Sequence, residues 1–367
     1  MYIFDGIKLA TEREALLKER IVRDFDEKLK IAAVLFIEDS GSQIYTRLKN
    51  EAAIRVGIGY EVHEFSLLDF NSDFKSGDNN FTSEKVVSKI QELNADSSVT
   101  GIIIQKPWRK TWVKAQSFGK DLQNNQEKPD LKSVNERNQY NSWWSSLTSQ
   151  ISEAKDVDGL HPNTIEQIKA GTWQEYGKVL PATCRAVLTI LDRVGERENF
   201  SVGSVDKNKI GEGKTIIIGK SDLLGRPLYY ELLRRKGDFQ QQIELIASRE
   251  LKERMKSGQK LLDASIIVSA TGIRNLITGD MISSGVTVID VGEPLPDVDF
   301  VSVSPKTSFI TPVPGGVGPM TVISLLENCV SLVLQGEEGE EGEEGEEGEE
   351  GEEGEEGEEG ELRSKRS

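Results

Sequence analysis

Cysteine and histidine are scarce in this sequence. The 367 residues include two cysteines, Cys184 and Cys329, and two histidines, His63 and His161. Neither cysteine belongs to a Cys-x-x-Cys pair or lies at metal-ligand spacing from a histidine, so we expect no metal site and two buried, reduced thiols. Nothing in the pattern requires a Ser–His–Asp triad. We expect His63 to be a hydrogen-bonded strand residue and His161 to lie near the functional site.

Long apolar runs and a secretion signal are also missing. No uninterrupted apolar run reaches the roughly 18 residues that a membrane-spanning helix needs. The N-terminus carries Asp5 and Glu12 where a signal peptide would have basic and then apolar residues. We therefore expect a soluble, cytoplasmic protein without a membrane partner.

An excess of positive charge is absent as well. The formal net charge is −17, but the last 32 residues hold 17 of the 62 acidic residues and three of the 45 basic ones. The rest of the chain therefore has 45 acidic and 42 basic residues. This near-neutral part of the chain lacks the excess of basic residues that nucleic-acid binding requires.

The acidity belongs to a Gly-Glu-Glu repeat that covers Gly336–Glu361. This segment has no apolar side chain to bury, and its like charges repel one another. Glycine at every third position also disfavours a helix. We predict that residues 335–367 form a disordered tail that takes no part in catalysis.

Buried strands and amphipathic helices alternate in the first part of the chain. This alternation is typical of an α/β domain with a parallel sheet. The predicted strands are 31–37, 60–65 and 99–104, and the predicted helices are 42–56 and 82–93.

The same alternation returns after residue 155 and predicts a second α/β domain. Its predicted strands are 214–219, 243–247, 265–270 and 286–291, and its predicted helices are 164–170, 183–194 and 224–235. We expect residues 1–163 and a C-terminal helix at 312–334 to form one domain. Residues 164–311 would form the other, with a cleft between the two.

Residues 108–153 interrupt the alternation. They are polar, rich in Asn, Gln and Ser, and contain Trp108, Trp112, Trp143 and Trp144. We interpret the segment as a long surface excursion that its tryptophans partly order. Anchoring is the more plausible role for these aromatic rings than stacking on a ligand.

A nucleotide-binding turn is predicted after the strand that starts at Lys214. The strand stops at Gly219, and the turn to Gly225 leads into a helix. Glycine lets the backbone approach a phosphate, and the helix N-terminus offers free N–H groups and a positive dipole. Ser221 replaces the middle glycine of G-x-G-x-x-G, so the spacing alone is a weak signal.

The end of the next strand indicates which dinucleotide would bind. NAD sites usually place an Asp or Glu there, whereas Ser248 and Arg249 suit the extra phosphate of NADP. Lys220 in the preceding turn adds a further cation. The alternative is a loop of ordinary surface cations.

Tyr45 and Lys49 are the candidate acid–base pair. They are four residues apart on one helix and so share a face. A lysine beside an apolar stripe loses hydration, which lowers its pKa. Gln105 ends a buried strand, where open α/β sheets place their sites, and Lys155–Gly159 adds Asp156 and Asp158. The alternatives are a snorkelling surface pair, a loop-capping amide and carboxylates of a turn.

The segment Thr311–Thr321 contains three prolines and three glycines in eleven residues. Such a composition fixes an unusual loop shape. We expect an apolar helix to follow it, from Thr321 to about Leu334.

At this point several segments resemble the bifunctional methylenetetrahydrofolate dehydrogenase/cyclohydrolase family. The most specific is TPVPGGVGPMT, and SQIYTRLKNEAAIRVGI is similar to the family's Ser-x-x-Tyr-x-x-x-Lys helix. The other similar segments are FDGIKLA, GIIIQ, KDVDG, IIGKSDLLGRP, SATG, VIDVG and PDVDF, all in family order. The resemblance covers roughly residues 2–334, interrupted by 108–153.

The resemblance implies oxidation of 5,10-methylenetetrahydrofolate and hydrolysis of the methenyl product by a metal-free homodimer. Its partners would be tetrahydrofolate derivatives, with NADP as cofactor and NAD as the alternative. Lys49 would be the acid–base residue, Gln105 would tune it, and Tyr45 would orient the folate. The residues implied to bind folate also include Asp158, Pro314, Gly315 and Gly316. Those implied to bind the cofactor are Gly219, Lys220, Ser221, Gly225, Ser248, Arg249 and Thr271.

The sequence departs from the family in four places. Lys106-Pro107-Trp108-Arg109 stands where the family usually has Leu-Pro-Leu-Pro, and Pro181–Cys184 differs from Pro-Cys-Thr-Pro. Lys220 replaces an arginine, which weakens the expectation of NADP. The 108–153 segment and the acidic tail are foreign to the pattern. A monofunctional, NAD-linked dehydrogenase and a non-catalytic binding protein remain the alternatives, although the retained Lys49 argues against the first.

Overall fold

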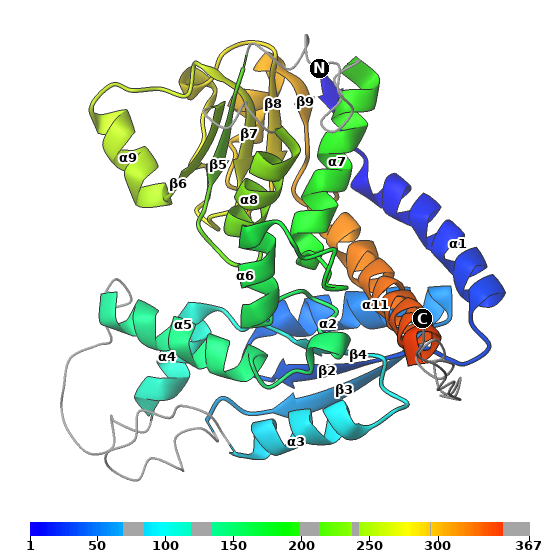
Figure 1. The fold of residues 1–367 in the computed structure, drawn as a ribbon. Coiled ribbons are helices and arrows are strands. Elements are labelled where there is room, and N and C mark those ends of the chain that lie inside the picture. Colours follow the sequence, from blue (N-terminus) through cyan, green and yellow to red (C-terminus); the bar gives the residue numbers. More distant parts are fainter. Residues whose placement is uncertain (69–83, 119–133, 199–212, 237–241, 294, 348–367) are drawn as a thin grey trace, which may run out of the picture.

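Two parallel sheets form the centres of two lobes (Figure 1). The computed structural model describes residues 1–68, 84–118, 134–198, 213–236, 242–293 and 295–347. The smaller sheet has the order β3-β2-β4, and the larger has the order β1-β9-β8-β7-β5-β6. Every neighbouring pair of strands is parallel. The α/β class with two parallel sheets is therefore confirmed.

The smaller sheet comprises β2 (Lys30–Phe36), β3 (Gly59–Phe65) and β4 (Gly101–Ile104). Its central strand β2 is buried on both faces, because successive side chains point to opposite sides. Ala32, Val34 and Phe36 face one apolar cluster, and Ile31 and Ala33 face another. The flanking helices are α2 (Ser40–Val56), α3 (Glu84–Ala95), α4 (Arg109–Phe118) and α5 (Val134–Thr148).

The interpretation of residues 108–153 as a surface excursion is wrong for the part that the structure describes. Helices α4 and α5 cover one face of the smaller sheet. Trp112, Trp143 and Trp144 are at most 5% exposed and pack in the cluster that holds Phe36. Anchoring is thus the role of three tryptophans, whereas Trp108 is 40% exposed. Residues 119–133 lie outside the described residues.

The larger sheet comprises β5 (Lys214–Ile218), β6 (Ile243–Ile246), β7 (Ala264–Ser269), β8 (Val286–Asp290), β9 (Thr307–Ile310) and β1 (Tyr2–Ile3). One face contacts α7 (Ala182–Glu198) and α8 (Gly225–Lys236), and α9 (Ser248–Lys256) packs on the other. Short helices lie at Glu153–Lys155, Gly279–Met281, Phe300–Val303 and Ser304–Lys306.

The chain passes between the lobes more often than the expected domain boundaries allow. Strand β1 pairs with β9, so residues 2 and 3 belong to the larger sheet and not to the first domain. Helices α1 (Gly6–Asp24) and α6 (Pro162–Ala170) then lie beside the region where the lobes meet (Figure 1).

Helix α11 (Val317–Glu347) returns to the first lobe as expected, and packs against α1, α2 and α7. Its part from Val317 to Gln335 is long and apolar enough to cross a membrane by composition, but 61% of it is buried in the protein. Such burial is typical of a core helix.

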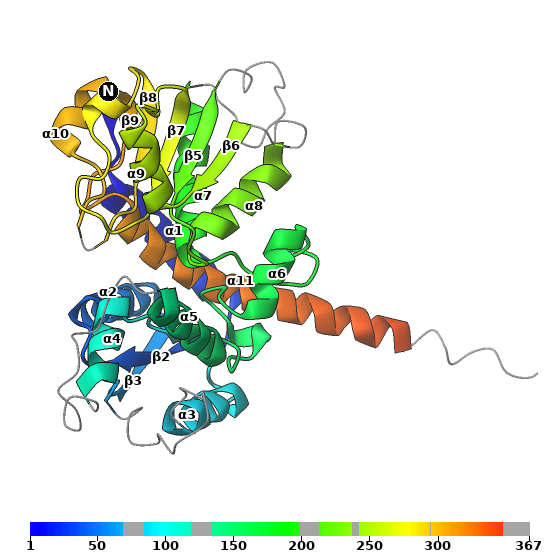
Figure 2. The same ribbon diagram turned by 90° about the vertical axis from the view of Figure 1, so that its left-hand side faces the viewer.

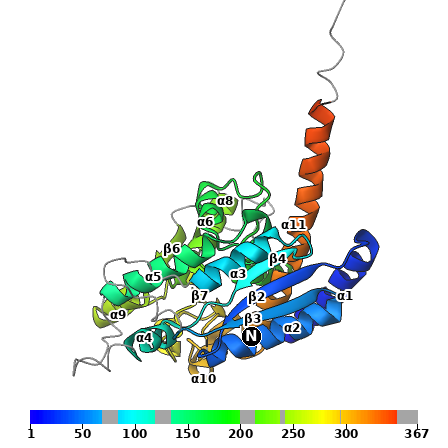
Figure 3. The same ribbon diagram turned by 90° about the horizontal axis from the view of Figure 1, so that it is seen from below.

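The prediction that order ends at residue 335 is wrong for residues 335–347. Helix α11 continues through them and projects beyond both lobes (Figures 2 and 3). The apolar part of α11 already forms the helical nucleus, and each further residue then adds one hydrogen bond without a new nucleation cost. Residues 348–367 lie outside the described residues.

Candidate active site

Helix α2 carries Tyr45 and Lys49 into the region between the lobes. The helix starts at a buried Asp39, whose carboxylate accepts hydrogen bonds from the backbone N–H of Ser42 at 3.0 Å and from its hydroxyl at 2.7 Å. Gly57 ends the helix with φ at 93°, a conformation that glycine adopts without strain. These two ends fix the register of the helix and hence the positions of both side chains.

Lys49 is 5% exposed, and its ammonium donates a hydrogen bond of 3.0 Å to the side-chain carbonyl of Gln105. Gln105 follows β4, and its backbone N–H donates a hydrogen bond of 2.8 Å to the carbonyl of Val34. Burial lowers the pKa of Lys49, because the charged form loses hydration; the carboxylates of Asp158 and Glu293 oppose this shift. The predicted pair of Lys49 and Gln105 is therefore brought together.

The two carboxylates of the 155–159 segment have different surroundings. Asp156 is 2% exposed and accepts from the backbone N–H groups of Leu160 at 3.1 Å and His161 at 2.8 Å, which makes it a turn residue. Asp158 interacts electrostatically with Lys49. Burial raises the pKa of Asp158, while Lys49 and the N–H of Ala182 oppose the rise. Of the two carboxylates in this segment, Asp158 is thus the one that interacts with Lys49.

Asn328 on α11 holds the segment around Asp158 in place. Its buried side-chain amide donates to the carbonyl of Val157 and to that of Leu180, both at 2.9 Å, and its oxygen accepts from Arg185 at 2.8 Å. Sequence reasoning missed this residue. A polar residue in the middle of an apolar helix was the available signal.

The segment Thr311–Thr321, which we call the Pro-Gly loop, also approaches Tyr45. A Cβ atom on Gly318 would stand 3.5 Å from the Tyr45 hydroxyl, so this loop and α2 are in close contact. Gly315 has φ at 96°, and a Cβ on Gly316 would lie 2.5 Å from the carbonyl of Pro312. The Val313–Pro314 peptide bond is cis. The loop therefore requires glycine at both positions.

Glu293 is a second residue that sequence reasoning missed. It follows β8 in the second lobe and is exposed at the surface of the chain. The protein nevertheless surrounds its carboxyl group closely enough to remove part of its hydration, which raises its pKa to about 7. The charge of Lys49 opposes this rise, and the charge of Asp39 adds to it. Glu293 also raises the pKa of Tyr45, after burial as the main cause. The carboxylate therefore faces the first lobe.

The turn after β5 has the close backbone packing that the glycine pattern predicts. Gly219 has φ at 121°, and a Cβ there would stand 2.4 Å from the carbonyl of Ala270. A Cβ on Gly225 would lie 1.7 Å from the carbonyl of Gly219, so the turn cannot accept a larger residue there. Ser221 and Leu223 lie within this turn, and Leu223 packs against the aromatic cluster of the first lobe. The turn thus contacts both lobes.

Two of the predicted phosphate ligands, Ser248 and Arg249, lie at the N-terminus of α9. Ser248 is the first residue of the helix, and the Arg249 side chain is 89% exposed and paired with Glu253 at 2.9 Å. Glu250 folds back toward the helix start, where it accepts from the N–H of Ala247 at 3.2 Å and contacts Lys220 at 3.2 Å. A carboxylate is therefore present at this end of the sheet, although the strand itself ends without one.

Thr271 does not project freely toward a ligand. Its backbone N–H and its hydroxyl both donate to the buried Asp297, at 2.7 and 2.8 Å. Asp297 also accepts from Ser269 at 2.7 Å and from the N–H of Ile273 at 2.9 Å. The loop after β7 is thus held by a carboxylate, and its backbone remains the part that can face a nucleotide.

Lys106 occupies the position next to Gln105, where the sequence departs from its family pattern. Its ammonium lies 4.7 Å from the ring centre of Trp144 and 5.5 Å from that of Tyr140. Burial lowers its pKa to about 8, and Asp222 of the nucleotide turn opposes the shift. The aromatic faces favour the charged form as well.

The remaining candidates are structural. His63 pairs with Glu61 at 3.0 Å within β3, and His161 caps the start of α6. Cys184 and Cys329 are buried free thiols, as predicted. Within the described ranges, no group of three or more His, Cys, Asp or Glu side chains is placed to hold a metal ion.

Two family models match this chain. Residues 4–122 match the catalytic domain of tetrahydrofolate dehydrogenase/cyclohydrolase, and residues 181–336 match its NAD(P)-binding domain. The bifunctional protein FolD of Mesoplasma florum is 32% identical over 89% of this chain and 96% of its own length. That of Moorella thermoacetica is 31% identical over 89% of this chain and 97% of its own length.

Solved structures resemble most of the chain. The bifunctional FolD enzyme of Campylobacter jejuni superposes with a TM-score of 0.63 at 27% identity, covering 91% of this chain and 99% of its own. A methylenetetrahydrofolate dehydrogenase from the silkworm, Bombyx mori, superposes with a TM-score of 0.61, also at 27% identity, over 91% of this chain and 99% of its own.

Proposed function

Because the chain belongs to the tetrahydrofolate dehydrogenase/cyclohydrolase family, we infer that it is a bifunctional enzyme of folate metabolism. It oxidises 5,10-methylenetetrahydrofolate to the 5,10-methenyl cation with NAD(P). It then hydrolyses that cation to 10-formyltetrahydrofolate. The observation that carries the second activity is the buried Lys49 ammonium at 3.0 Å from Gln105.

Proton transfer in the hydrolysis falls to Lys49. Water adds to the methenyl carbon, and the ring opens once a proton has left the water and another has reached the departing ring nitrogen. A lysine with a lowered pKa can accept and return a proton near neutral pH. Gln105 holds the ammonium in one orientation through its side-chain carbonyl. The Asp158 and Glu293 carboxylates keep the pKa of Lys49 from falling further.

Tyr45, Asp158 and the Pro-Gly loop form the folate subsite in this proposal. Asp158 has carboxylate oxygens that can accept from the amino and ring N–H groups of a pterin. The ring of Tyr45 can pack on the flat pterin, because its hydroxyl already rests against Gly318. Pro314, Gly315 and Gly316 shape the wall opposite this ring.

The dinucleotide would lie on the turn Gly219–Gly225 and on the start of α9. The fit is supported by the two glycine positions, where a Cβ would collide with backbone. Lys220, Ser221, Ser248, Arg249 and the backbone at Thr271 would hold the phosphates. Bound there, the dinucleotide would supply the acceptor for the hydride from the methylene carbon, and these residues would supply orientation.

NADP is the cofactor that we propose, with NAD as the alternative. Arg249 and Ser248 suit a 2′-phosphate, and the exposed guanidinium can turn toward it. Glu250 favours NAD instead, because its carboxylate sits beside Lys220 and would repel a phosphate. A homodimer, which the family resemblance implies, and a cytoplasmic location complete the proposal. The two buried free thiols fit a reducing compartment.

A monofunctional dehydrogenase is the second candidate. The Lys49–Gln105 contact favours the bifunctional enzyme, because a chain without hydrolase activity has no need of a buried lysine there. The deciding experiment follows methenyltetrahydrofolate by its absorbance, with NADP and NAD in parallel. Formation of methenyltetrahydrofolate that does not decay faster than in buffer would leave only the dehydrogenase.

A further inference from the structure

The ammonium of Lys106 lies between the two lobes without an anion in contact with it. It stands over the ring centres of Trp144 at 4.7 Å and Tyr140 at 5.5 Å, both on α5. Among the described residues it meets no carboxylate at ion-pair distance and no hydrogen-bond acceptor; Asp222 acts on its charge from farther away. A cation that has lost hydration gains most from an anion that joins it.

The backbone that carries Lys106 is anchored to the first lobe. The carbonyl of Lys106 accepts a hydrogen bond from the Ser42 hydroxyl at 3.2 Å. The next carbonyl, that of Pro107, accepts from the hydroxyl of Tyr140. The ammonium therefore projects from a fixed base, so little further ordering is needed when an anion binds.

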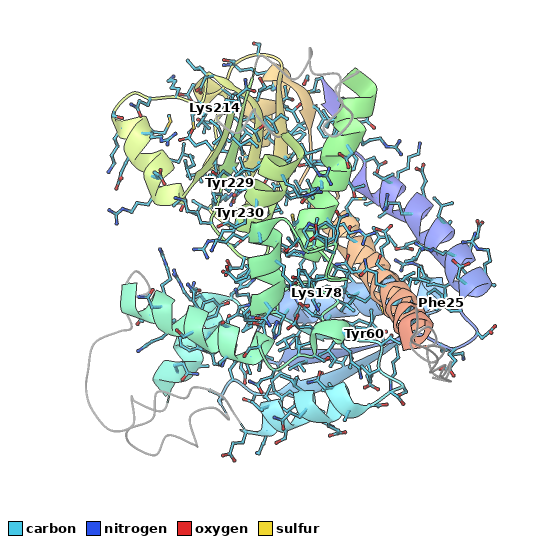
Figure 4. All side chains as sticks on the ribbon, in the orientation of Figure 1. Phe25, Tyr60, Lys178, Lys214, Tyr229 and Tyr230 are labelled. Atoms are coloured by element: carbon cyan, nitrogen blue, oxygen red, sulfur yellow. The ribbon has the colours of Figure 1, made fainter. Side chains whose placement is uncertain are left out.

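The nearest part of the second lobe is the turn between β5 and α8. Leu223 of this turn packs on the aromatic cluster of the first lobe, and the carboxylate of Asp222 acts on Lys106. Figure 4 shows α5 in the lower lobe and, above it, the upper lobe, in which Tyr229 and Tyr230 mark α8. Lys106 is thus a residue of the first lobe that faces the nucleotide turn of the second.

The folate site is the other place from which an anion could come. Its charged groups are Lys49, Asp158 and Glu293, which act on one another. None of the three acts on Lys106, whose charge interacts with Asp222 instead. The ammonium is therefore closer in its electrostatics to the dinucleotide turn than to the folate site.

Three cations of the second lobe near the proposed dinucleotide site already have a carboxylate partner. The pairs, at distances of 2.9 to 3.2 Å, are Lys220 with Glu250, Arg226 with Asp222, and Arg249 with Glu253. Each of these side chains must give up an ion pair to bind a phosphate. A contact between Lys106 and a phosphate breaks none.

We propose that Lys106 binds the pyrophosphate of the dinucleotide, so that the first lobe contributes a cofactor-binding residue across the gap between the lobes. The inference rests on the proposed dehydrogenase function. A pyrophosphate on the glycine turn brings the negative charge that the ammonium lacks, and a charge-assisted hydrogen bond forms between them. NADP and NAD share this group, so Lys106 serves both, unlike a ligand of the 2′-phosphate.

Calorimetry on the full chain in the absence of folate measures the binding of NADP and NAD. Lys106→Gln should weaken both at least about tenfold, because one charged phosphate contact is lost. Lys106→Arg keeps the charge and should bind both more tightly than Lys106→Gln. Lys110→Gln removes the same charge from an exposed position on α4 and should leave both affinities unchanged.

A second variant separates lost binding from misfolding. Lys106→Leu places an apolar side chain against the rings of Trp144 and Tyr140. It should lose as much affinity as Lys106→Gln, with an undiminished free energy of unfolding in urea. Unchanged affinity for both dinucleotides in either variant would overturn the assignment of Lys106.

The same titrations distinguish the other possible anions. Weaker binding of NADP alone in Lys106→Gln would place the 2′-phosphate at Lys106 and overturn the pyrophosphate contact. Weaker binding of tetrahydrofolate, with both dinucleotides unaffected, would assign the ammonium to a folate carboxylate instead. An unaltered chain that binds neither dinucleotide would refute the proposed function itself, and the inference with it.

Asp222→Asn tests whether the two side chains simply hold the lobes together. In the pyrophosphate assignment this change removes a negative charge beside the phosphate, so it should tighten the binding of both dinucleotides. A loss of affinity as large as that of Lys106→Gln would mean that Lys106 pairs with Asp222 when the lobes close, and would overturn the phosphate contact.

Discussion

A buried lysine keeps its proton only if its surroundings replace the lost hydration. Lys49 has one neutral acceptor at 3.0 Å and two carboxylates that act over a longer range. The Gln105 amide orients the Lys49 ammonium but, being neutral, does not hold it in the charged form. The two carboxylates limit the fall of the Lys49 pKa. The lysine can therefore change protonation state during a reaction, which an ion pair at contact distance would oppose.

Replacement of Lys49 separates the two activities. Lys49→Met should lower methenyl hydrolysis at least about a hundredfold, because no other group takes over the proton transfer. Hydride transfer should stay measurable, since it moves no proton through the lysine. Both rates are measured on the same preparation by absorbance. Hydrolysis at the unaltered rate would exclude Lys49 as the acid–base residue.

Glu293→Gln should move the pH profile of hydrolysis. The carboxylate raises the pKa of Lys49, so its loss lowers that pKa and shifts the limb that Lys49 controls to lower pH, by about 0.5–1 unit. Glu51→Gln, on the exposed side of α2, is the matched control and should leave the profile in place. A shift to higher pH, or the same shift in both variants, would contradict the assignment.

Arg249 and Glu250 should determine the choice of cofactor in opposite directions. Arg249→Ala should raise the KM for NADP at least tenfold, because a charged phosphate contact contributes roughly 1.5–3 kcal/mol. It should barely change the KM for NAD. Glu250→Gln removes the negative charge beside Lys220 and should lower the KM for NADP. Equal changes for both cofactors would show that neither side chain is near the 2′-phosphate.

At the level of elements, the apolar runs predicted the strands from β2 to β8 to within two residues. Strands β1 and β9 escaped prediction. Strand β1 has only two residues and pairs with β9 alone, whereas β9 has four residues and pairs with both β1 and β8. Helices α4 and α5 escaped because their polar composition masks a narrow aromatic stripe. Only the three-dimensional partner of that stripe, the face of β2 with Phe36, shows that it is core.

The aromatic stripe should contribute much of the stability of the first lobe. Trp143 is 1% exposed and lies 5.5 Å from Phe36, 5.7 Å from Trp112 and 5.8 Å from Tyr140, measured between ring centres. Trp143→Ala should therefore reduce the free energy of unfolding by about 3–5 kcal/mol, measured in urea. Trp108→Ala, at a 40% exposed ring, should cost much less. Equal costs would mean that the stripe is not core.

Helix α11 positions the folate subsite through Asn328. Asn328→Leu should leave the carbonyls of Val157 and Leu180 without their buried donor, which costs about 2–4 kcal/mol. The KM for folate should rise, because Val157 adjoins Asp158. Ser331→Ala, one turn along α11, removes a 3.4 Å contact with Arg185 and a local 2.8 Å bond to the carbonyl of Glu327, but no bond to the segment around Asp158, so it should change both quantities much less.

The site was only partly predictable from sequence, for a related reason. Lys49, Gln105 and Asp158 lie at recognisable places in local patterns, so they could be found one by one. Asn328 and Glu293 act from segments more than 130 residues away, and their role exists only once both lobes have formed. The residues implied to bind the cofactor remain predictions, although the glycine turn fits them.

At the scale of the whole molecule, the chain passes several times between the two lobes. Strand β1, the segment around α6, and the Pro-Gly loop each carry the chain from one lobe toward the other (Figure 1). Leu223 of the nucleotide turn also rests on the aromatic cluster of the first lobe. Small rotations of one lobe against the other would therefore move Glu293 and the nucleotide turn together relative to Lys49.

The pairing of β1 with β9 has a consequence for the order in which the protein is made. Tyr2 and Ile3 leave the ribosome first, yet their partners Phe309 and Ile310 are translated about 300 residues later. At roughly 5–20 residues per second, the first strand waits on the order of 15–60 s for its neighbour. Until then the large sheet has an unpaired edge at β8, because β9 is also still to come. The nascent chain can complete the first lobe's small sheet early, but its second lobe closes only when synthesis is nearly finished.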